Sequence, residues 1–187
     1  MFLSCHWQGV RIGRADPATR ATPARRYAPA RVNPDPHGPY DAARPRPHRS
    51  DPPDWPVWCC AILRDLRGRF IFERRPSHEI DAPGMLTCFG GGREAGEEPE
   101  TCLRRELVEE LGWRAGALEL CVVLTTPKGV AWFYRGAGPE EGTVTALEAG
   151  YVAEWIEPAA LAAAGVGGWN LAAIDAEMRG LRVARAD

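Results

Sequence analysis

Apolar and polar residues follow two different periods along the chain, and these periods predict its secondary structure. Residues 57–63 form an apolar run of strand length, and residues 69–74 alternate with a period of two. The turn between the two segments makes them a predicted β-hairpin. Further strands are expected at 85–89, 118–124 and 130–134, and the last one contains Glu154 and Trp155.

Two segments instead have the period of an α-helix. The first begins near Pro99 and stops at Gly112, with an apolar stripe of Leu103, Leu107 and Leu111. The second begins at Trp169, and the face expected to pack on the sheet holds Leu171, Ile174, Met178 and Leu181. Strands that alternate with helices predict an α/β fold, in which a mixed sheet lies between helices as an α/β/α sandwich.

The first 56 residues differ from the rest of the chain. They contain 11 of the 17 prolines and few large apolar side chains, so they cannot form a core. We expect a disordered segment at 1–56, a folded domain at 57–180 and a C-terminal tail at 181–187, with fraying of residues 184–187. Disorder without a known role is the first interpretation of this segment. The alternatives are a tail that binds an anionic partner and a targeting segment.

Charge is divided unevenly between these parts. Residues 1–50 hold nine arginines and three acids, whereas residues 51–187 hold 14 basic and 22 acidic residues, a net charge of −8. An acidic domain is a poor match for long nucleic acid but suits a metal-loaded site for a small anion. The six cysteines form no CxxC pair, and no apolar run reaches about 18 residues. A cytoplasmic protein with reduced cysteines and no membrane segment is therefore expected.

Three carboxylates gather on one side of the first helix. Glu106, Glu109 and Glu110 fall within an arc of about 100°. Like charges at these spacings repel, and the negative end of the helix dipole disfavours two of them. The acidic stripe also flanks the apolar stripe instead of opposing it. A bound hard cation such as Mg²⁺ would remove both penalties.

The alternative is a solvated acidic face. Glu100 with Arg104, and Arg105 with Glu109, are ordinary partners at i,i+4. These pairs leave unexplained why three acids cluster next to a glycine run at residues 90–92.

The segment Gly91 to Trp113 resembles the Nudix box, G-x5-E-x7-R-E-U-x-E-E-x-G-U, where U is a bulky apolar residue. Gly91, Glu97, the Arg105-Glu106 pair, the Glu109-Glu110 pair and Gly112 occupy its fixed positions. The match is complete over 23 residues, and Trp113 is a mild variation at the last position. The chain is thus identified as similar to the Nudix hydrolase family, which includes MutT-like proteins, and a Nudix fold is implied.

The resemblance implies a set of metal ligands. Glu106, Glu109 and Glu110 are the expected ligands of Mg²⁺, with Mn²⁺ as the alternative ion, and the Gly90 carbonyl is expected to assist. By the same resemblance Glu97 braces the loop and helps to bind metal, and Glu148 adds a ligand or a base, against a solvated loop acid as its alternative.

Other residues are expected to handle the substrate. Arg105 has no lone pair for a metal and should orient a neighbouring carboxylate. Gly91 and Gly92 should shape a loop around the metal-bound phosphates. Either Arg74 or Arg75 is a candidate contact for a substrate phosphate, with simple surface charge as the alternative.

The implied activity is metal-dependent hydrolysis of a phosphoanhydride bond in a nucleoside diphosphate linked to another moiety. Either Glu109 or Glu110 would accept the proton. A non-catalytic nucleotide-binding sensor and an isopentenyl diphosphate isomerase that uses Cys88 are the rival interpretations. Nucleoside triphosphates, ADP-ribose, dinucleoside polyphosphates and capped RNA ends are candidate substrates, and the small size of the domain favours the first. The sequence carries no signal for an oligomeric state.

Overall fold

The computed structural model describes residues 55–144, 147 and 149–186. Its elements are, in order, β1 (Trp58–Arg64), β2 (Phe70–Arg74), β3 (Leu86–Thr87), β4 (Phe89–Gly92), α1 (Pro99–Leu111), β5 (Glu119–Thr126), β6 (Gly129–Ala137), β7 (Val152–Ile156), the 3-10 helix η1 (Pro158–Ala160), α2 (Gly168–Met178) and β8 (Val183–Arg185). Almost all of the expected segment 1–56 lies outside the described residues.

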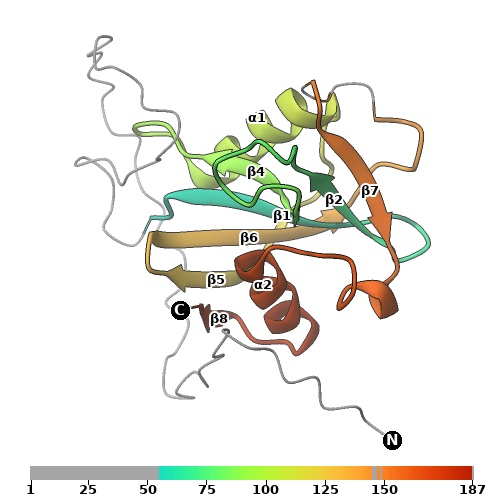
Figure 1. The fold of residues 1–187 in the computed structure, drawn as a ribbon. Coiled ribbons are helices and arrows are strands. Elements are labelled where there is room, and N and C mark those ends of the chain that lie inside the picture. Colours follow the sequence, from blue (N-terminus) through green and yellow to red (C-terminus); the bar gives the residue numbers. More distant parts are fainter. Residues whose placement is uncertain (1–54, 145–146, 148, 187) are drawn as a thin grey trace, which may run out of the picture.

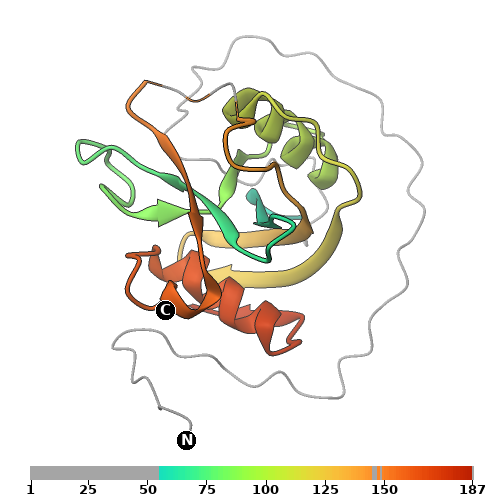
Figure 2. The ribbon, with the colours of Figure 1, turned by 90° about the vertical axis from the view of Figure 1, so that its right-hand side faces the viewer.

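Strand β1 organises the sheet because both of its edges are paired. One edge runs parallel to β6 along the whole strand. The other edge changes partner, since residues 58–61 pair with β4 and residues 63–64 pair with β2, both antiparallel. The strand order is β3-β2-β1-β6-β5-β8, with β4 on β1 and β7 on β2. Helices α1 and α2 lie on opposite faces of this mixed sheet (Figures 1 and 2), which confirms the predicted α/β/α sandwich.

The two faces of the sheet carry separate parts of the core. The stripe of α1 is fully buried as predicted and packs against Leu63 of β1, Ile71 of β2 and Phe89 of β4. On the other face, α2 packs against residues that include Phe72, Val122 and Phe133. The first helix also has the predicted ends, with Pro99 in its first turn and Gly112 as a left-handed cap at φ 61°.

The packing face of α2 agrees with the prediction only in part. Ile174 is buried as predicted, and Leu171 and Leu181 pack partly buried against the core. Met178 is 56% exposed, however, and the rest of the buried face consists of Ala172, Ala173 and Ala176. Small side chains let a helix approach a sheet closely, and the spacing of the large residues alone cannot reveal such a face.

The glycine run and its neighbours also differ from the prediction. The expected strand 85–89 is divided at Cys88 into β3, which pairs with β2, and β4, which pairs with β1. Gly90, Gly91 and Gly92 therefore lie in strand β4 and not in a loop. Gly90 has φ 127°, and a β-carbon there would overlap the carbonyl oxygen of Cys59, so the close approach of β4 to β1 requires glycine.

The fraying expected at residues 184–187 is also not found for Ala184 and Arg185. Val183–Arg185 forms β8, which pairs in parallel with β5, and Ala184 is buried. This pairing joins segments that are far apart in sequence, so local pattern does not reveal it. None of the helices in the described ranges is long and apolar enough to span a membrane.

Candidate active site

The three clustered carboxylates of α1 face one pocket. Glu106, Glu109 and Glu110 lie beside the buried stripe, at the edge of the core, and line a cavity of about 420 Å³. Its other lining residues are Glu73, Arg75, Leu147 and Tyr151. The helix thus buries its leucines under the sheet and presents its acids to an open space large enough for a small ligand.

Arg105 is the centre of the hydrogen-bond network beside this pocket. Its guanidinium donates to both carboxylate oxygens of Glu97, at 3.0 and 3.1 Å. One nitrogen also donates to Glu106 at 2.7 Å and to Glu109 at 3.1 Å. A planar guanidinium holds such partners in fixed directions, so Arg105 orients two of the three pocket carboxylates.

Two glycines let strand β4 approach the acids. The Gly90 amide donates a hydrogen bond of 2.9 Å to the Glu110 carboxylate. A β-carbon on Gly91 would lie 2.6 Å from the carboxyl group of Glu106. The glycine run therefore provides the space in which Glu106 and Glu110 sit, and its third member, Gly92, accepts a hydrogen bond of 3.2 Å from Arg105.

Negative charge accumulates in this pocket. Burial raises the pKa of Glu110 well above its ordinary value, and repulsion from Glu73 and Glu106 adds to the effect against the Gly90 amide and Arg75. Burial also raises the pKa of Glu106, although Arg105 opposes that shift. Carboxylates in this state gain from a proton or from a cation that enters the pocket.

The two candidate arginines occupy different places. Arg74 is outside the pocket lining and forms a bidentate ion pair with Glu154 of β7, at 2.6 and 2.9 Å. Arg75 lines the pocket, where it contacts Glu79 at 3.2 Å and donates to the Asp81 carbonyl at 2.9 Å. Of the two, only Arg75 is brought together with the acids of α1.

Sequence reasoning did not identify Glu73, Leu147 and Tyr151 as pocket residues. For Glu73 a signal existed. It shares a strand face with Ile71, which is buried under α1, so a carboxylate stands at a core-facing position. Glu73 is only 6% exposed, its carboxylate lies 3.6 Å from Arg75, and it accepts a hydrogen bond of 3.4 Å from Thr87.

The other two carboxylates predicted to bind metal are Glu97 and Glu148. Glu97 accepts a hydrogen bond from the Glu94 amide at 3.0 Å, and with its bonds to Arg105 it ties the loop before α1 to the helix. It does not line the pocket. Glu148 lies outside the described residues.

The chemistry of the donor set suits a hard divalent cation, because carboxylate oxygens are its preferred ligands. Gly90 and Gly91 leave room beside Glu106 and Glu110. Burial raises the pKa values of these two carboxyl groups, and a bound cation would favour their charged forms. Across residues 55–144, 147 and 149–186, however, no three His, Cys, Asp or Glu side chains are already placed so that they could hold a metal ion together. The described acids thus form an open, acidic pocket.

Comparison with solved structures places the fold among related proteins. A MutT protein from Methanosarcina mazei is 17% identical, with a TM-score of 0.57, over 66% of this chain and 93% of that one. The ORF135 protein of E. coli is 23% identical, with a TM-score of 0.52, over 66% and 89%. The Nudix domain of Shewanella oneidensis NrtR, solved with ADP ribose, is 16% identical, with a TM-score of 0.53, over 65% and 84%. At these identities the likeness concerns the fold.

Sequence comparison identifies the family itself. No curated protein matches the chain. The model of the NUDIX domain, in contrast, matches residues 55–173, which is more than half of the chain and includes the whole acidic pocket. The chain therefore belongs to the Nudix family, as a hydrolase that acts on acid anhydrides in phosphorus-containing compounds.

Proposed function

We propose that the protein is a metal-dependent hydrolase of the phosphoanhydride bond in a nucleoside diphosphate linked to another moiety, with nucleoside triphosphates as the first candidates. The observation that carries the proposal is the pocket in which Glu106, Glu109 and Glu110 face one space beside the glycines of β4. Nucleotide substrates are also supported by the NrtR Nudix domain, which has the same fold and was solved with ADP ribose.

Glu106, Glu109 and Glu110 would hold Mg²⁺, or Mn²⁺, with help from the Gly90 carbonyl. A divalent ion there supplies charge neutralisation on the phosphates and a lower pKa of bound water. Glu97 is a weaker candidate ligand, because both of its oxygens already accept hydrogen bonds from Arg105.

The residues of the chain have three further tasks. Glu109 or Glu110 is our candidate proton acceptor, because both carboxylates line the pocket beside the proposed metal. Arg105 keeps Glu106 and Glu109 in place. Arg75, at the rim of the pocket, binds a substrate phosphate, and the main chain at Gly91 and Gly92 leaves room for it.

The isomerase alternative gains no support from the position of Cys88. This residue is buried in the core cluster on the α2 face and does not line the acidic pocket. Burial also raises the pKa of its thiol, so a reactive thiolate is disfavoured. The sensor alternative is separated from hydrolysis by the experiment that follows.

The test is release of phosphate or pyrophosphate from a panel of nucleoside triphosphates, ADP-ribose, dinucleoside polyphosphates and capped RNA, with and without Mg²⁺. We expect one strong substrate, no activity in EDTA, and a loss of at least about 100-fold in Glu110→Gln. Glu100→Gln is the matched control, since Glu100 lies on the same helix but its carboxylate pairs with Arg104 at 2.8 Å on the surface. Near-native turnover of Glu110→Gln would refute the assignment, and binding without turnover across the panel would favour a sensor.

A further inference from the structure

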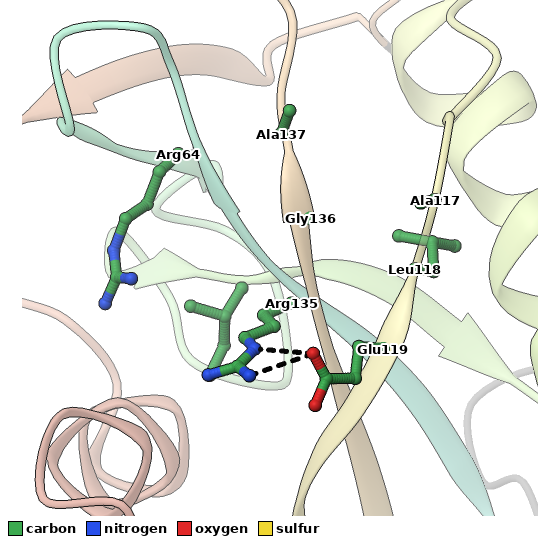
Figure 3. Close-up of a pocket in the computed structure, with 8 residues that line it drawn as sticks. Arg64, Ala117, Leu118, Glu119, Arg135, Gly136 and Ala137 are labelled. Carbon is green, nitrogen blue, oxygen red and sulfur yellow. Dashed lines mark hydrogen bonds and ion pairs between the residues drawn. The ribbon is translucent and has the colours of Figure 1, made fainter.

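A second cavity lies beside Arg64, the last residue of β1, which donates a hydrogen bond to Glu177 of α2. Its volume is about 410 Å³, within the range of small-molecule sites, and its lining includes Ile62, Arg64, Leu118, Glu119, Arg135 and Ala137. It shares no lining residue with the acidic pocket. Figure 3 shows Arg64 and Arg135 extending from neighbouring strands, with Glu119 turned towards Arg135.

The two arginines of this cavity are held in different ways. Arg64 donates to Glu177 of α2 at 2.6 and 3.4 Å, and it lies 4.4 Å above the ring of Phe70. The side chain of Glu177 is only 5% exposed, so this anion is a fixed part of the fold.

Arg135 is paired mainly with a surface acid. It donates to Glu119 at 2.8 and 3.1 Å, and the side chains of both residues are about half exposed. Exposed ion pairs contribute little free energy, because solvent screens the attraction and both side chains lose rotamer freedom. Glu119 can therefore leave Arg135 at small cost, whereas Glu177 cannot leave Arg64.

The charges around the cavity are also unequal. Arg182 approaches Glu119 at 3.8 Å, and Glu177 approaches Arg135 at 3.7 Å. The cluster thus alternates three arginines with two glutamates and carries a net positive charge, in a part of the chain that is otherwise acidic. The lining beside it includes the apolar side chains of Ile62 and Ala137.

We propose that this cavity binds a small organic oxyanion, whose carboxylate or phosphate head group replaces Glu119 on Arg135. A guanidinium recognises either head group through two parallel hydrogen bonds. The carbon chain of the ligand lies against Ile62 and Ala137. The site is separate from the proposed hydrolytic centre and does not depend on it.

Butyrate and butyl phosphate test the proposal, since they share a carbon chain and differ in head group. Each is titrated into the metal-free protein in EDTA, and the backbone amide signals of Gly136 and Ala137 are followed by NMR. We expect saturable shifts, and the tighter of the two ligands identifies the preferred head group.

Three variants assign the contact. Arg135→Gln should weaken binding by about tenfold, and Arg135→Lys should recover part of it. Glu119→Gln should tighten binding several-fold, because it removes the competing anion. Arg179→Gln is the matched control, since Arg179 is a similarly exposed arginine that pairs with Asp175 at 3.1 Å outside the cavity, and it should change nothing.

Binding should become weaker in Arg135→Gln and tighter in Glu119→Gln. These opposite changes in affinity distinguish a specific site from general attraction of anions. Absence of saturable shifts with both ligands would overturn the proposal. Equal losses in Arg135→Gln and Arg179→Gln, or weaker binding in Glu119→Gln, would overturn it as well.

Discussion

Glu110 and Glu177 occupy equivalent positions in the two helices, because each is the last residue but one. The helix dipole is unfavourable for both. Glu177 lies between Arg64 and Arg135, at 2.6 and 3.7 Å. Glu110 accepts a backbone hydrogen bond from Gly90 and faces Glu73 and Glu106, so its pKa is raised. The fold neutralises one acid with its own arginines and keeps the other available for an external cation.

The largest expected difference between these glutamates is in catalysis. Glu177→Gln should leave kcat within about twofold, whereas Glu110→Gln should lower it by about 100-fold or more. Steady-state kinetics on the substrate found in the panel measure both values. A comparable loss of kcat in the two variants would mean that the distinction between a structural and a functional acid is wrong.

A smaller effect is expected from the glycine that makes room for Glu106. In Gly91→Ala the new methyl group would lie 2.6 Å from the Glu106 carboxylate, so that this carboxylate has to move. We expect kcat to fall by about tenfold. Gly116→Ala is the control, since a β-carbon there meets open space. An unchanged kcat in Gly91→Ala, with the fold verified by circular dichroism, would show that the position of Glu106 is not critical.

The smallest effects concern stability. Replacement of Glu110 should stabilise the protein, whereas replacement of Glu177 should destabilise it. Because the folded-state pKa of Glu110 is raised, the folded state binds more protons above the ordinary carboxyl pKa, and stability falls as pH rises through that window. Glu110→Gln should therefore stabilise the metal-free protein at pH 7, and the gain should vanish at pH values below the ordinary carboxyl pKa.

Glu177→Gln should instead destabilise the protein at pH 7, by about 1 kcal/mol, since Arg64 is partly exposed and solvent screens part of the loss. Urea unfolding of both variants in EDTA measures the two changes. A loss of stability in Glu110→Gln would contradict the interpretation that its charge is uncompensated in the absence of metal.

The features that could be predicted from the sequence are those set by local spacing. The limits of α1, its leucine stripe and the three acids beside that stripe all follow from residues three or four apart. The family motif added the glycines, and it also singled out Arg105 and Glu97, whose contacts lie within the same short segment.

What could not be predicted depends on contacts between distant segments. The strand pattern places Glu73 on a core-facing position, but it does not reveal that β2 lies beside the acids of α1. That neighbourhood arises because one edge of β1 pairs first with β4 and then with β2. Strand β8 exists through its pairing with β5. The glycine run becomes a strand although glycine has a low strand propensity, because β1 offers it a paired edge. The alanine face of α2 depends on close approach, which hydrophobic periodicity does not report.

The hairpin from β2 to β3 has a consequence for how this enzyme could change through evolution or engineering. The amide of Arg75 bonds to the carbonyl of Met85 at 3.0 Å, and residues 73 and 74 pair with 87 and 86. The ends of the loop 76–84 are thereby fixed, while its middle carries Ile80 with 89% of its surface exposed. Insertions or exchanges in this loop should alter the rim around Arg75 without moving β4 or α1, so that new substrate preferences can be grafted onto an unchanged set of carboxylates.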